Sequence, residues 1–362
     1  MRLESLGVQN FRNLCQQGFE ADPELTVISG QNGQGKTNLL ECVWLLTGSK
    51  SFRGSRDVDL VRHGEGFARV VGSALCAEQP KKIEIAIGGA ESDKKGRSAK
   101  VNGVSYPRAT AIAGIFTAVV FDPGHLSLVK GGPEGRRRFL DAALCQLYPG
   151  YVATLRRFAR ALTQKNALLK KYRVTPDADF LLDTFDSELA FTGEEITARR
   201  TEYLAKAGPL ARQIYGEISG GAEEIRLAFL PSCEKGGLQA LMKQSRPADI
   251  KAGFCTTGPH REDFETFLNE SSAKAYGSQG QQRSVALSLK LAEAGNAHLV
   301  TGDHPVLLLD DVLSELDESR QHYLLSKMSG KQSFVTTCDA TAFKRTAGKI
   351  VVMEKGKIAA PT

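Results

Sequence analysis

The stretch GQNGQGKT, Gly30–Thr37, decides the fold of this chain. It fits the pattern G-x-x-x-x-G-K-[ST], follows an apolar run at residues 25–28 and precedes the helix-forming run NLLECVWLL at residues 38–46. Glycines let successive backbone amides point inward around a phosphate, and the start of the following helix adds positive potential. The sequence therefore predicts a phosphate-binding loop between a strand and a helix, made of Gly30, Gln31, Asn32, Gly33, Gln34, Gly35, Lys36 and Thr37.

Two side chains of this loop are expected to act on a bound nucleotide. Lys36 is expected to reach the β- and γ-phosphates of ATP, and the Thr37 hydroxyl is expected to bind Mg²⁺. A second motif, VLLLDD at residues 306–311, is an unbroken apolar run that ends in two carboxylates. Such a run is typical of a strand buried on both faces of a parallel sheet, whose carboxyl end is where ligands bind. Asp310 is therefore predicted to hold Mg²⁺, and Asp311 to polarise an attacking water as a general base.

The distance along the chain between these motifs predicts a large insertion. Lys36 and Asp310 are 274 residues apart, far more than a small GTPase or nucleotide kinase needs. Strand-like runs extend to about residue 125, helical patterns run from about 133 to 218 with a break at RVTPDADF (173–180), and strands and turns return after about 220. We therefore expect an α/β fold, with an ATPase lobe (1–130 and 221–362) interrupted by a mostly helical, basic lobe (131–220).

Positive charge is concentrated in one part of the chain. The total is +6, but residues 130–173 hold eleven Lys and Arg against two acidic residues, so this segment is +9 and the remainder −3. A local basic surface favours a polyanion such as DNA, although a solvated helix face is the alternative for any single arginine. The predicted DNA contacts are Arg136, Arg137, Arg138, Arg156 and Arg160.

A polar stretch, SQGQQ at residues 278–282, precedes the acidic strand, and LSELD at residues 313–317 follows it. This order of motifs resembles the ABC-type ATPases, in which the Ser/Gly/Gln signature of one subunit contacts the γ-phosphate held by another. A helix that begins at a small polar loop offers free amides and a positive dipole end to a triphosphate. By this resemblance, Ser278, Gly280 and Gln281 face the nucleotide of a second copy.

Within that class the chain is similar to the RecF family over nearly its whole length. The resemblance rests on NFRN (10–13), GQNGQGKTNLLE (30–41), LVKGGPEGRRRFLD (128–141), LRRFARALTQKNALLK (155–170), GPHREDF (258–264), YGSQGQQRSVALSLKLAE (276–293) and LLLDDVLSELD (307–317). Two departures stand out. Glu262 replaces an expected second aspartate, and VTTCDATAF (335–343) lacks the histidine of transporter ATPases, so Thr336 and Thr337 are left as candidates for that position.

The resemblance implies a DNA-repair and replication ATPase that closes as an ATP-dependent homodimer on single-strand/double-strand junctions. It implies slow, DNA-stimulated hydrolysis and the partners RecO and RecR, which assist recombinase loading. Arg12 and Asn13 are expected near the nucleotide base or ribose. His260 and Arg261 are either a structural turn, which we favour, or an interdomain contact.

Three alternatives remain. A transporter-energising subunit usually has a shorter insertion and a membrane-partner surface, and a long SMC-type coiled coil lacks the sustained heptads it needs here. A scaffold that binds ATP with negligible turnover stays open. No apolar run approaches the roughly 20 residues that span a bilayer. The N-terminus lacks a signal-like apolar segment and the seven cysteines are dispersed, so a cytoplasmic, nucleoid-associated protein without membrane contacts is expected.

Overall fold

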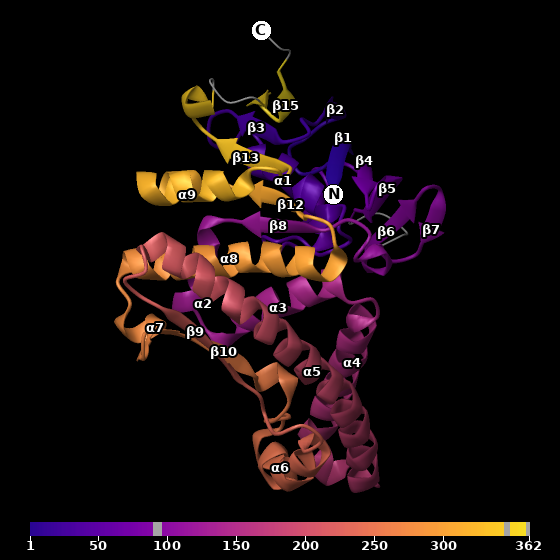
Figure 1. Ribbon diagram of the computed structural model, residues 1–362. Coiled ribbons are helices and arrows are strands. Elements are labelled where there is room, and N and C mark those ends of the chain that lie inside the picture. The colour runs from indigo at the N-terminus through magenta and orange to yellow at the C-terminus, as the bar shows by residue number, and fades with distance from the viewer. Residues whose placement is uncertain (90–95, 344–347, 360–362) are drawn as a thin grey trace. The chain divides into compact units, whose positions relative to one another are not determined.

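The structure is a computed structural model that describes residues 1–89, 96–343 and 348–359 (Figure 1). The chain divides into two compact units, one formed by Met1–His125 with Ala286–Thr362 and the other by Leu126–Val285. The first unit is therefore built from two separate parts of the sequence, and the second unit is inserted between them.

A mostly parallel sheet forms the centre of the first unit, in the order β15-β14-β3-β13-β12-β8. Its strands are β3 (Leu25–Ser29), β8 (Ala118–Phe121), β12 (Val306–Leu309), β13 (Ser333–Thr337), β14 (Lys349–Glu354) and β15 (Lys357–Ile358). All neighbouring pairs are parallel except β14 with β15. All four residues of β12 are buried, as its unbroken apolar sequence predicts for a central parallel strand. Because β3, β13, β12 and β8 run in the same direction, their carboxyl ends meet at one edge.

An antiparallel sheet in the order β2-β1-β4-β5-β6-β7 completes the strand structure of this unit. Its strands are β1 (Arg2–Gln9), β2 (Gln17–Glu20), β4 (Phe67–Cys76), β5 (Gln79–Gly88), β6 (Gly96–Val101) and β7 (Val104–Tyr106). Side chains of β4 alternate between buried and more exposed positions, the pattern of a sheet with one face on the core. The buried side of this sheet faces helix α1 (Lys36–Leu45).

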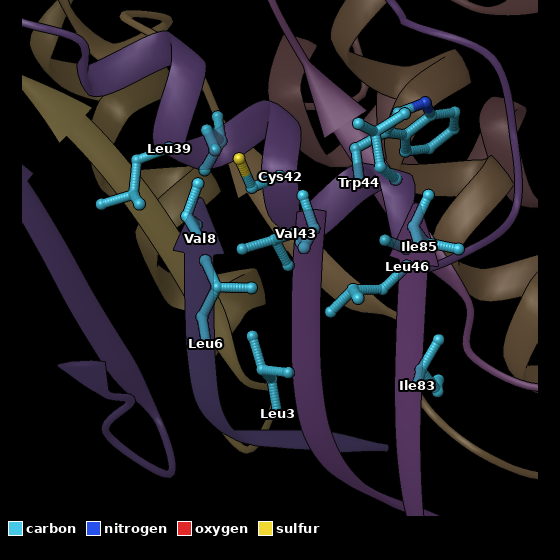
Figure 2. Close-up of a cluster of buried hydrophobic side chains, with 14 of the residues drawn as sticks. Leu3, Leu6, Val8, Leu39, Cys42, Val43, Trp44, Leu46, Ile83 and Ile85 are labelled. Carbon is cyan, nitrogen blue, oxygen red and sulfur yellow. The ribbon is translucent and has the colours of Figure 1, made fainter. Parts of the chain in front are cut away.

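Helix α1 packs against strands of both sheets and lies at the centre of the main hydrophobic core. Figure 2 shows the apolar side chains that meet there: Leu3, Leu6, Val8, Leu39, Cys42, Val43, Trp44, Leu46, Ile83 and Ile85. The sheets are also joined by Gln332, whose amide accepts from Leu3 N at 2.6 Å and donates to Leu3 O at 2.7 Å. The helix that begins in the phosphate-binding loop is thus fixed by the core. Truncating one of its buried leucines to alanine should cost about 2–5 kcal/mol.

Two further helices belong wholly or partly to the first unit. Helix α9 (Glu318–Met328) begins after Asp317, whose carboxylate accepts from Arg320 N at 3.0 Å as a helix cap. Helix α8 (Gln279–Thr301) is continuous and crosses the boundary between the units at residue 285. Its alternating Val285, Leu287, Leu289 and Leu291 could also have fitted a strand, and the helix resolves that ambiguity.

The second unit combines helices with a small sheet. Its helices are α2 (Ser127–Lys130), α3 (Pro133–Leu147), α4 (Tyr151–Lys170), α5 (Ala178–Ser219), α6 (Leu238–Ala252) and α7 (Ala273–Tyr276). The antiparallel sheet β11-β10-β9 is formed by β9 (Ile225–Leu230), β10 (Asp263–Leu268) and β11 (Ser271–Ser272). Helices α4 and α5 lie side by side (Figure 1) and are joined through the break predicted around Pro176 and Asp177.

Buried ion pairs hold the second unit together. Lys165 of α4 lies 2.8 Å from Asp186 of α5 and 2.8 Å from Asp249 of α6, and all three side chains are fully buried. Arg200 of α5 pairs with Asp141 of α3 at 3.0 Å and with Glu262 at 2.9 Å. Each arginine or lysine thus connects elements that are far apart in the sequence.

The second unit extends further toward the C-terminus than the expected boundary at residue 220. The return of strand-like sequence predicts that residues 221–285 belong to the ATPase lobe. Strands β9 and β10 instead pair with each other and pack beside α5 and α3, not with the parallel sheet. Sequence patterns indicate a strand but do not identify the sheet that it joins.

Among the described residues, no helix is both long and apolar enough to cross a bilayer.

Candidate nucleotide-binding site

The predicted phosphate-binding loop lies between β3 and α1, at the carboxyl edge of the parallel sheet. Two of its glycines are required by geometry. Gly30 has φ of 148°, and a Cβ there would lie 2.5 Å from the carbonyl oxygen of Met353. Gly35 has φ of 106°, and a Cβ there would lie 2.9 Å from Asn13 Oδ1. Other residues would be strained and crowded at both positions, so the loop depends on glycine here.

The Lys36 side chain turns back along this loop. Its Nζ donates to the carbonyl oxygens of Gly30 at 2.6 Å and Gln31 at 3.2 Å, and lies 3.2 Å from Cys338 Sγ. Lys36 is 4% exposed, so these partners offset the cost of burying its charge. The ammonium is therefore held against the backbone at the start of the loop.

Thr37 and Asp310 meet although they are 273 residues apart in the chain. Thr37 Oγ1 donates to Asp310 Oδ1 at 2.8 Å, and Thr336 Oγ1 donates to the same oxygen at 2.9 Å. The Thr336 hydroxyl also accepts from Asp311 N at 2.9 Å. Strands β3, β12 and β13 are neighbours in the sheet, which explains why their carboxyl ends bring these three groups together.

The carboxylate of Asp310 is buried next to other acids. Burial raises its pKa, and the charges of Asp311 and Asp122 act in the same direction, whereas the Thr37 and Thr336 hydrogen bonds lower it. The pKa of Asp122 is itself raised by burial. A cation at this edge would relieve the repulsion among the carboxylates. Hydroxyl and carboxylate oxygens are hard ligands that suit Mg²⁺, which binds through one or two carboxylates together with substrate phosphates.

Asp311 has its backbone in the left-handed region. Its φ is 51°, in the left-handed region, and its side chain is half-buried. Ser314 Oγ donates to its carbonyl oxygen at 2.7 Å. Left-handed backbone at a residue other than glycine is uncommon and is concentrated at functional sites.

Arg12 and Asn13 lie near the loop, and their side chains have different hydrogen-bond partners. Arg12 Nε donates to Glu41 Oε2 at 2.6 Å and its Nη2 donates to Ser55 Oγ at 2.7 Å. Asn13 Nδ2 donates to Gly33 O at 3.4 Å, and Asn13 Oδ1 accepts from Asn38 at 2.8 Å. Arg12 is engaged with a fully buried carboxylate, while Asn13 contacts the loop directly.

The predicted signature stretch begins α8 and belongs to the second unit. Ser278 N donates to Gln281 Oε1 at 2.6 Å and Gln281 N donates to Ser278 Oγ at 3.2 Å, a reciprocal cap of the helix start. Ser278 is exposed, and Gly280 and Gln281 are partly exposed. Within one copy these residues form a helix cap, with the hydroxyl-bearing residue on the surface.

Comparison with known proteins agrees with this geometry. Residues 2–359 match the family described as RecF/RecN/SMC N terminal domain. The chain is 41% identical to the DNA replication and repair protein RecF of Heliobacterium modesticaldum, over 95% of this chain and 94% of that protein.

The chain belongs to the RecF family.

Solved structures give the same result. The recombination mediator protein RecF-ATP in the RecFOR pathway superposes with a TM-score of 0.91 at 34% identity, covering 100% of this chain and 98% of that chain. An Smc head domain from Pyrococcus furiosus, in a complex with the C-terminal domain of ScpA, reaches a TM-score of 0.57 at 17% identity over 100% and 96% of the two chains. The latter likeness concerns the fold alone. The predicted ABC-type α/β fold and the RecF family resemblance are confirmed.

The five arginines predicted to contact DNA occupy different environments. Arg136 is 6% exposed; its guanidinium binds Asp263 through two hydrogen bonds of 2.7 Å and also donates to Leu128 O and Gly131 O. The expectation that Arg136 binds DNA therefore does not fit its burial, and its role here is structural. Arg137 is partly exposed, and Arg138, Arg156 and Arg160 are exposed.

Three residues of the site were missed or left undecided by sequence reasoning. Thr336, not Thr337, reaches Asp310, since the Thr337 hydroxyl donates to Asp339 O at 2.8 Å. Cys338 contacts Lys36, and nothing in its sequence context predicts this. Asp122 directly follows the apolar strand β8, beside β12, so the pattern of an apolar run ending in a carboxylate could have identified it.

Proposed function

We propose that this member of the RecF family binds ATP with Mg²⁺ and uses ATP-driven dimerisation to hold DNA during replication and recombinational repair. The proposal rests on one observation above all: Thr37 of the phosphate-binding loop and Asp310 at the end of β12 share a hydrogen bond of 2.8 Å. This contact between residues 273 positions apart supports a single site made from both parts of the chain. The ATP complex of the RecF relative supports the same assignment.

The roles of the residues follow from their positions. Lys36 would bind the β- and γ-phosphates, the amides of residues 30–35 would surround them, and Thr37 and Asp310 would hold the metal. Mg²⁺ would neutralise phosphate charge when bound with ATP. Asp311 would orient the attacking water as general base. Asn13 is better placed than Arg12 for the nucleoside, because Arg12 is held by Glu41.

The signature residues Ser278, Gly280 and Gln281 would act on the nucleotide of a second copy. Their exposure and their position at the start of α8, the positive end of the helix dipole, support this role. DNA would contact the exposed arginines Arg138, Arg156 and Arg160, with Arg137 beside them. RecO and RecR are proposed as partners because the RecF relative is described in the RecFOR pathway.

Single-turnover ATP hydrolysis with and without gapped DNA tests the proposal. The wild type should bind ATP, and gapped DNA should accelerate its hydrolysis, with an effect that falls steeply as salt rises. Lys36→Met should abolish ATP binding. Binding of ATP without any hydrolysis, with or without DNA, would favour a scaffold that stays in the ATP state. Absence of ATP binding by the wild type would contradict the proposal.

Arginine variants test the DNA contacts separately. Arg138→Ala should weaken DNA binding at unchanged stability, because its side chain is 71% exposed and its ion pair with Glu134 lies at the surface. Arg136→Ala should destabilise the second unit by about 3–5 kcal/mol, since it leaves Asp263 without its buried partner. Anisotropy of a labelled gapped DNA and urea unfolding distinguish the two effects. Equal stability of Arg136→Ala and the wild type would contradict the structural role.

A further inference from the structure

An exposed aromatic ring is held in place on the second unit by an anchored loop. Asp249, fully buried, accepts from Thr256 N at 2.8 Å and from Thr256 Oγ1 at 2.6 Å. Cys255 N donates to Asn166 Oδ1 at 2.7 Å. Phe254 precedes these anchored residues, yet its side chain is 42% exposed. Its exposure is therefore imposed by a fixed backbone.

Two arginines lie next to this ring. The guanidinium carbon of Arg261 is 5.2 Å from the centroid of Phe254, and Arg261 is exposed. Arg137 Nη1 donates to the carbonyl oxygen of Glu262, the residue after Arg261, at 2.8 Å. Phe254, Arg261 and Arg137 are called the basic–aromatic surface below.

The acids nearest to the basic–aromatic surface are already paired with other cations. The carboxylate of Glu262 accepts from Arg200 at 2.9 Å, and Asp263 is bound by Arg136 at 2.7 Å. Within the part of the chain that the structure describes, neither Arg137 nor Arg261 has a carboxylate at ion-pair distance. Glu262 and Asp263 are thus paired with Arg200 and Arg136, so the guanidinium groups of Arg137 and Arg261 can bind an anionic partner.

Neighbouring charges strengthen the positive potential at this surface. Burial lowers the pKa of Arg137, and the charges of Arg200 and Arg261 lower it further, whereas the charges of Asp263 and Glu134 raise it. Burial also lowers the pKa of His260, the hydrogen bond with the backbone of Cys255 raises it, and the charges of Arg261 and Arg137 lower it again. Lys170 is close as well, since a Cβ on Gly253 would lie 3.9 Å from Lys170 Cγ. An anion placed here would reduce the repulsion among these cations.

We propose that Phe254, Arg261 and Arg137 form a contact site for single-stranded DNA. An unpaired base would stack on Phe254, and Arg261 and Arg137 would bind the flanking phosphates. Cations alone would suit any nucleic-acid backbone, but an exposed ring beside a cation is the arrangement that stacks unpaired bases. The site rests on the proposed DNA-binding function and names the strand type and residues that this function would use. It also gives Arg261 a role beyond the structural turn favoured from the sequence.

Equilibrium binding of a fluorescein-labelled oligothymidine, followed by anisotropy with ATP and Mg²⁺, tests the aromatic contact. Phe254→Ala should weaken binding about 10-fold, within the range for loss of one base–aromatic stack. Phe180→Ala is the matched control, because Phe180 is also an exposed phenylalanine of this unit, at 71%. Binding of a blunt duplex should not change in either variant. Equal oligothymidine affinity of Phe254→Ala and the wild type would overturn the proposal.

The charge contact has its own control. Arg261→Ala should weaken oligothymidine binding and reduce the slope of log affinity against log salt by about 0.7, as for loss of one single-strand phosphate contact. Arg212→Ala, at an exposed arginine of α5, should leave both unchanged. An unchanged slope for Arg261→Ala would count against the site. A wild type that binds no DNA with ATP would refute the DNA-binding function as well, whereas normal binding by both variants would refute this site alone.

A tryptophan at the same position keeps the test valid if an alanine variant misfolds. Phe254→Trp should retain oligothymidine affinity within about threefold, because a larger ring stacks at least as well. Its added fluorescence should be quenched by the oligonucleotide. The single native tryptophan, Trp44, is 5% exposed and serves as the background measured in the wild type. If saturating oligonucleotide does not quench the fluorescence of the Phe254→Trp tryptophan, the ring does not stack on a base.

Discussion

At the scale of single residues, the site depends on how one carboxylate oxygen is held. Asp310 Oδ1 accepts hydrogen bonds from both Thr37 and Thr336, and the Thr336 hydroxyl also accepts from the backbone of Asp311. Thr336 thereby connects the proposed metal ligand with the proposed general base. It performs this role from β13, a strand that carries none of the recognised acidic residues.

Thr336→Val should slow ATP hydrolysis more than it weakens ATP binding. Valine keeps the shape but removes both hydrogen bonds, so we expect about a 10-fold loss in single-turnover rate, corresponding to roughly 1.4 kcal/mol. Thr337→Val is the control, since the Thr337 hydroxyl donates to Asp339 O and accepts from Asp339 N. Equal hydrolysis rates for the two variants would show that Thr336 does not position the acids.

His125 should make the first unit less stable in mild acid. Its Nδ1 accepts from Asp122 N at 2.9 Å and its Nε2 lies 3.1 Å from Asp122 Oδ2, so the neutral ring donates to the carboxylate. Burial and then the charge of Lys290 hold the His125 pKa well below its ordinary value. Below about pH 6.5, His125 binds a proton in the unfolded chain but stays neutral in the folded chain. Stability is therefore lost as pH falls through that value, by at most about 1.4 kcal/mol at pH 5.5.

Urea unfolding followed by Trp44 fluorescence at pH 7.5 and 5.5 measures this effect. His125→Gln should show a smaller loss between the two pH values than the wild type. His322→Gln, at an exposed position on α9, should behave as the wild type does. The same pH dependence in all three proteins would rule out His125 as a contributor.

At the scale of elements, the second unit is held by buried charges as much as by apolar packing. Lys165, Asp186 and Asp249 come from α4, α5 and α6 and are fully buried. Arg246 of α6 adds a contact to Asp186 at 2.8 Å. Side chains of this kind fix which helices are neighbours, because a shifted helix would leave a charge unpaired.

Lys165→Met should destabilise the second unit by about 3–5 kcal/mol, because two buried carboxylates lose their common partner. Lys170→Met, on the exposed side of the same helix, should change stability by less than about 0.5 kcal/mol. Circular dichroism at helical wavelengths reports both units, and Trp44 fluorescence reports the first alone, so a transition seen only by circular dichroism belongs to the second unit. Similar unfolding midpoints for the two variants would mean that the buried triad contributes little.

Sequence patterns predicted helices and strands better than they predicted which residues contact each other. The apolar run before Asp310 predicted a strand buried in a parallel sheet, because only buried strands can be apolar on both faces, and the run before Gly30 predicted a second strand. In the sheet, β13 lies between these two strands. The sequence Arg136–Arg138 did not indicate which of the three arginines is buried. Successive helix residues point about 100° apart, so three adjacent arginines cannot share one face, and Arg136 turns inward to Asp263. Likewise, Cys338 reaches Lys36 only through pairing of β13 with β3, which no local pattern encodes.

At the scale of the whole molecule, the central claim is that two copies complete each other's nucleotide site. Lys36→Met retains Ser278, and Ser278→Arg retains the phosphate-binding loop. If the signature acts in the second copy, neither variant should dimerise alone with ATP. A mixture of the two should form heterodimers, because one composite site then has an intact loop facing an intact Ser278.

The most direct measurement is sedimentation velocity of Lys36→Met, Ser278→Arg and their equimolar mixture, each with ATP and Mg²⁺. Ser278→Arg should bind ATP but remain a monomer, Lys36→Met should remain a monomer without binding ATP, and the mixture should contain a dimer with one bound ATP. Full dimerisation of Ser278→Arg alone, or a mixture that stays monomeric while the wild type dimerises, would contradict the account.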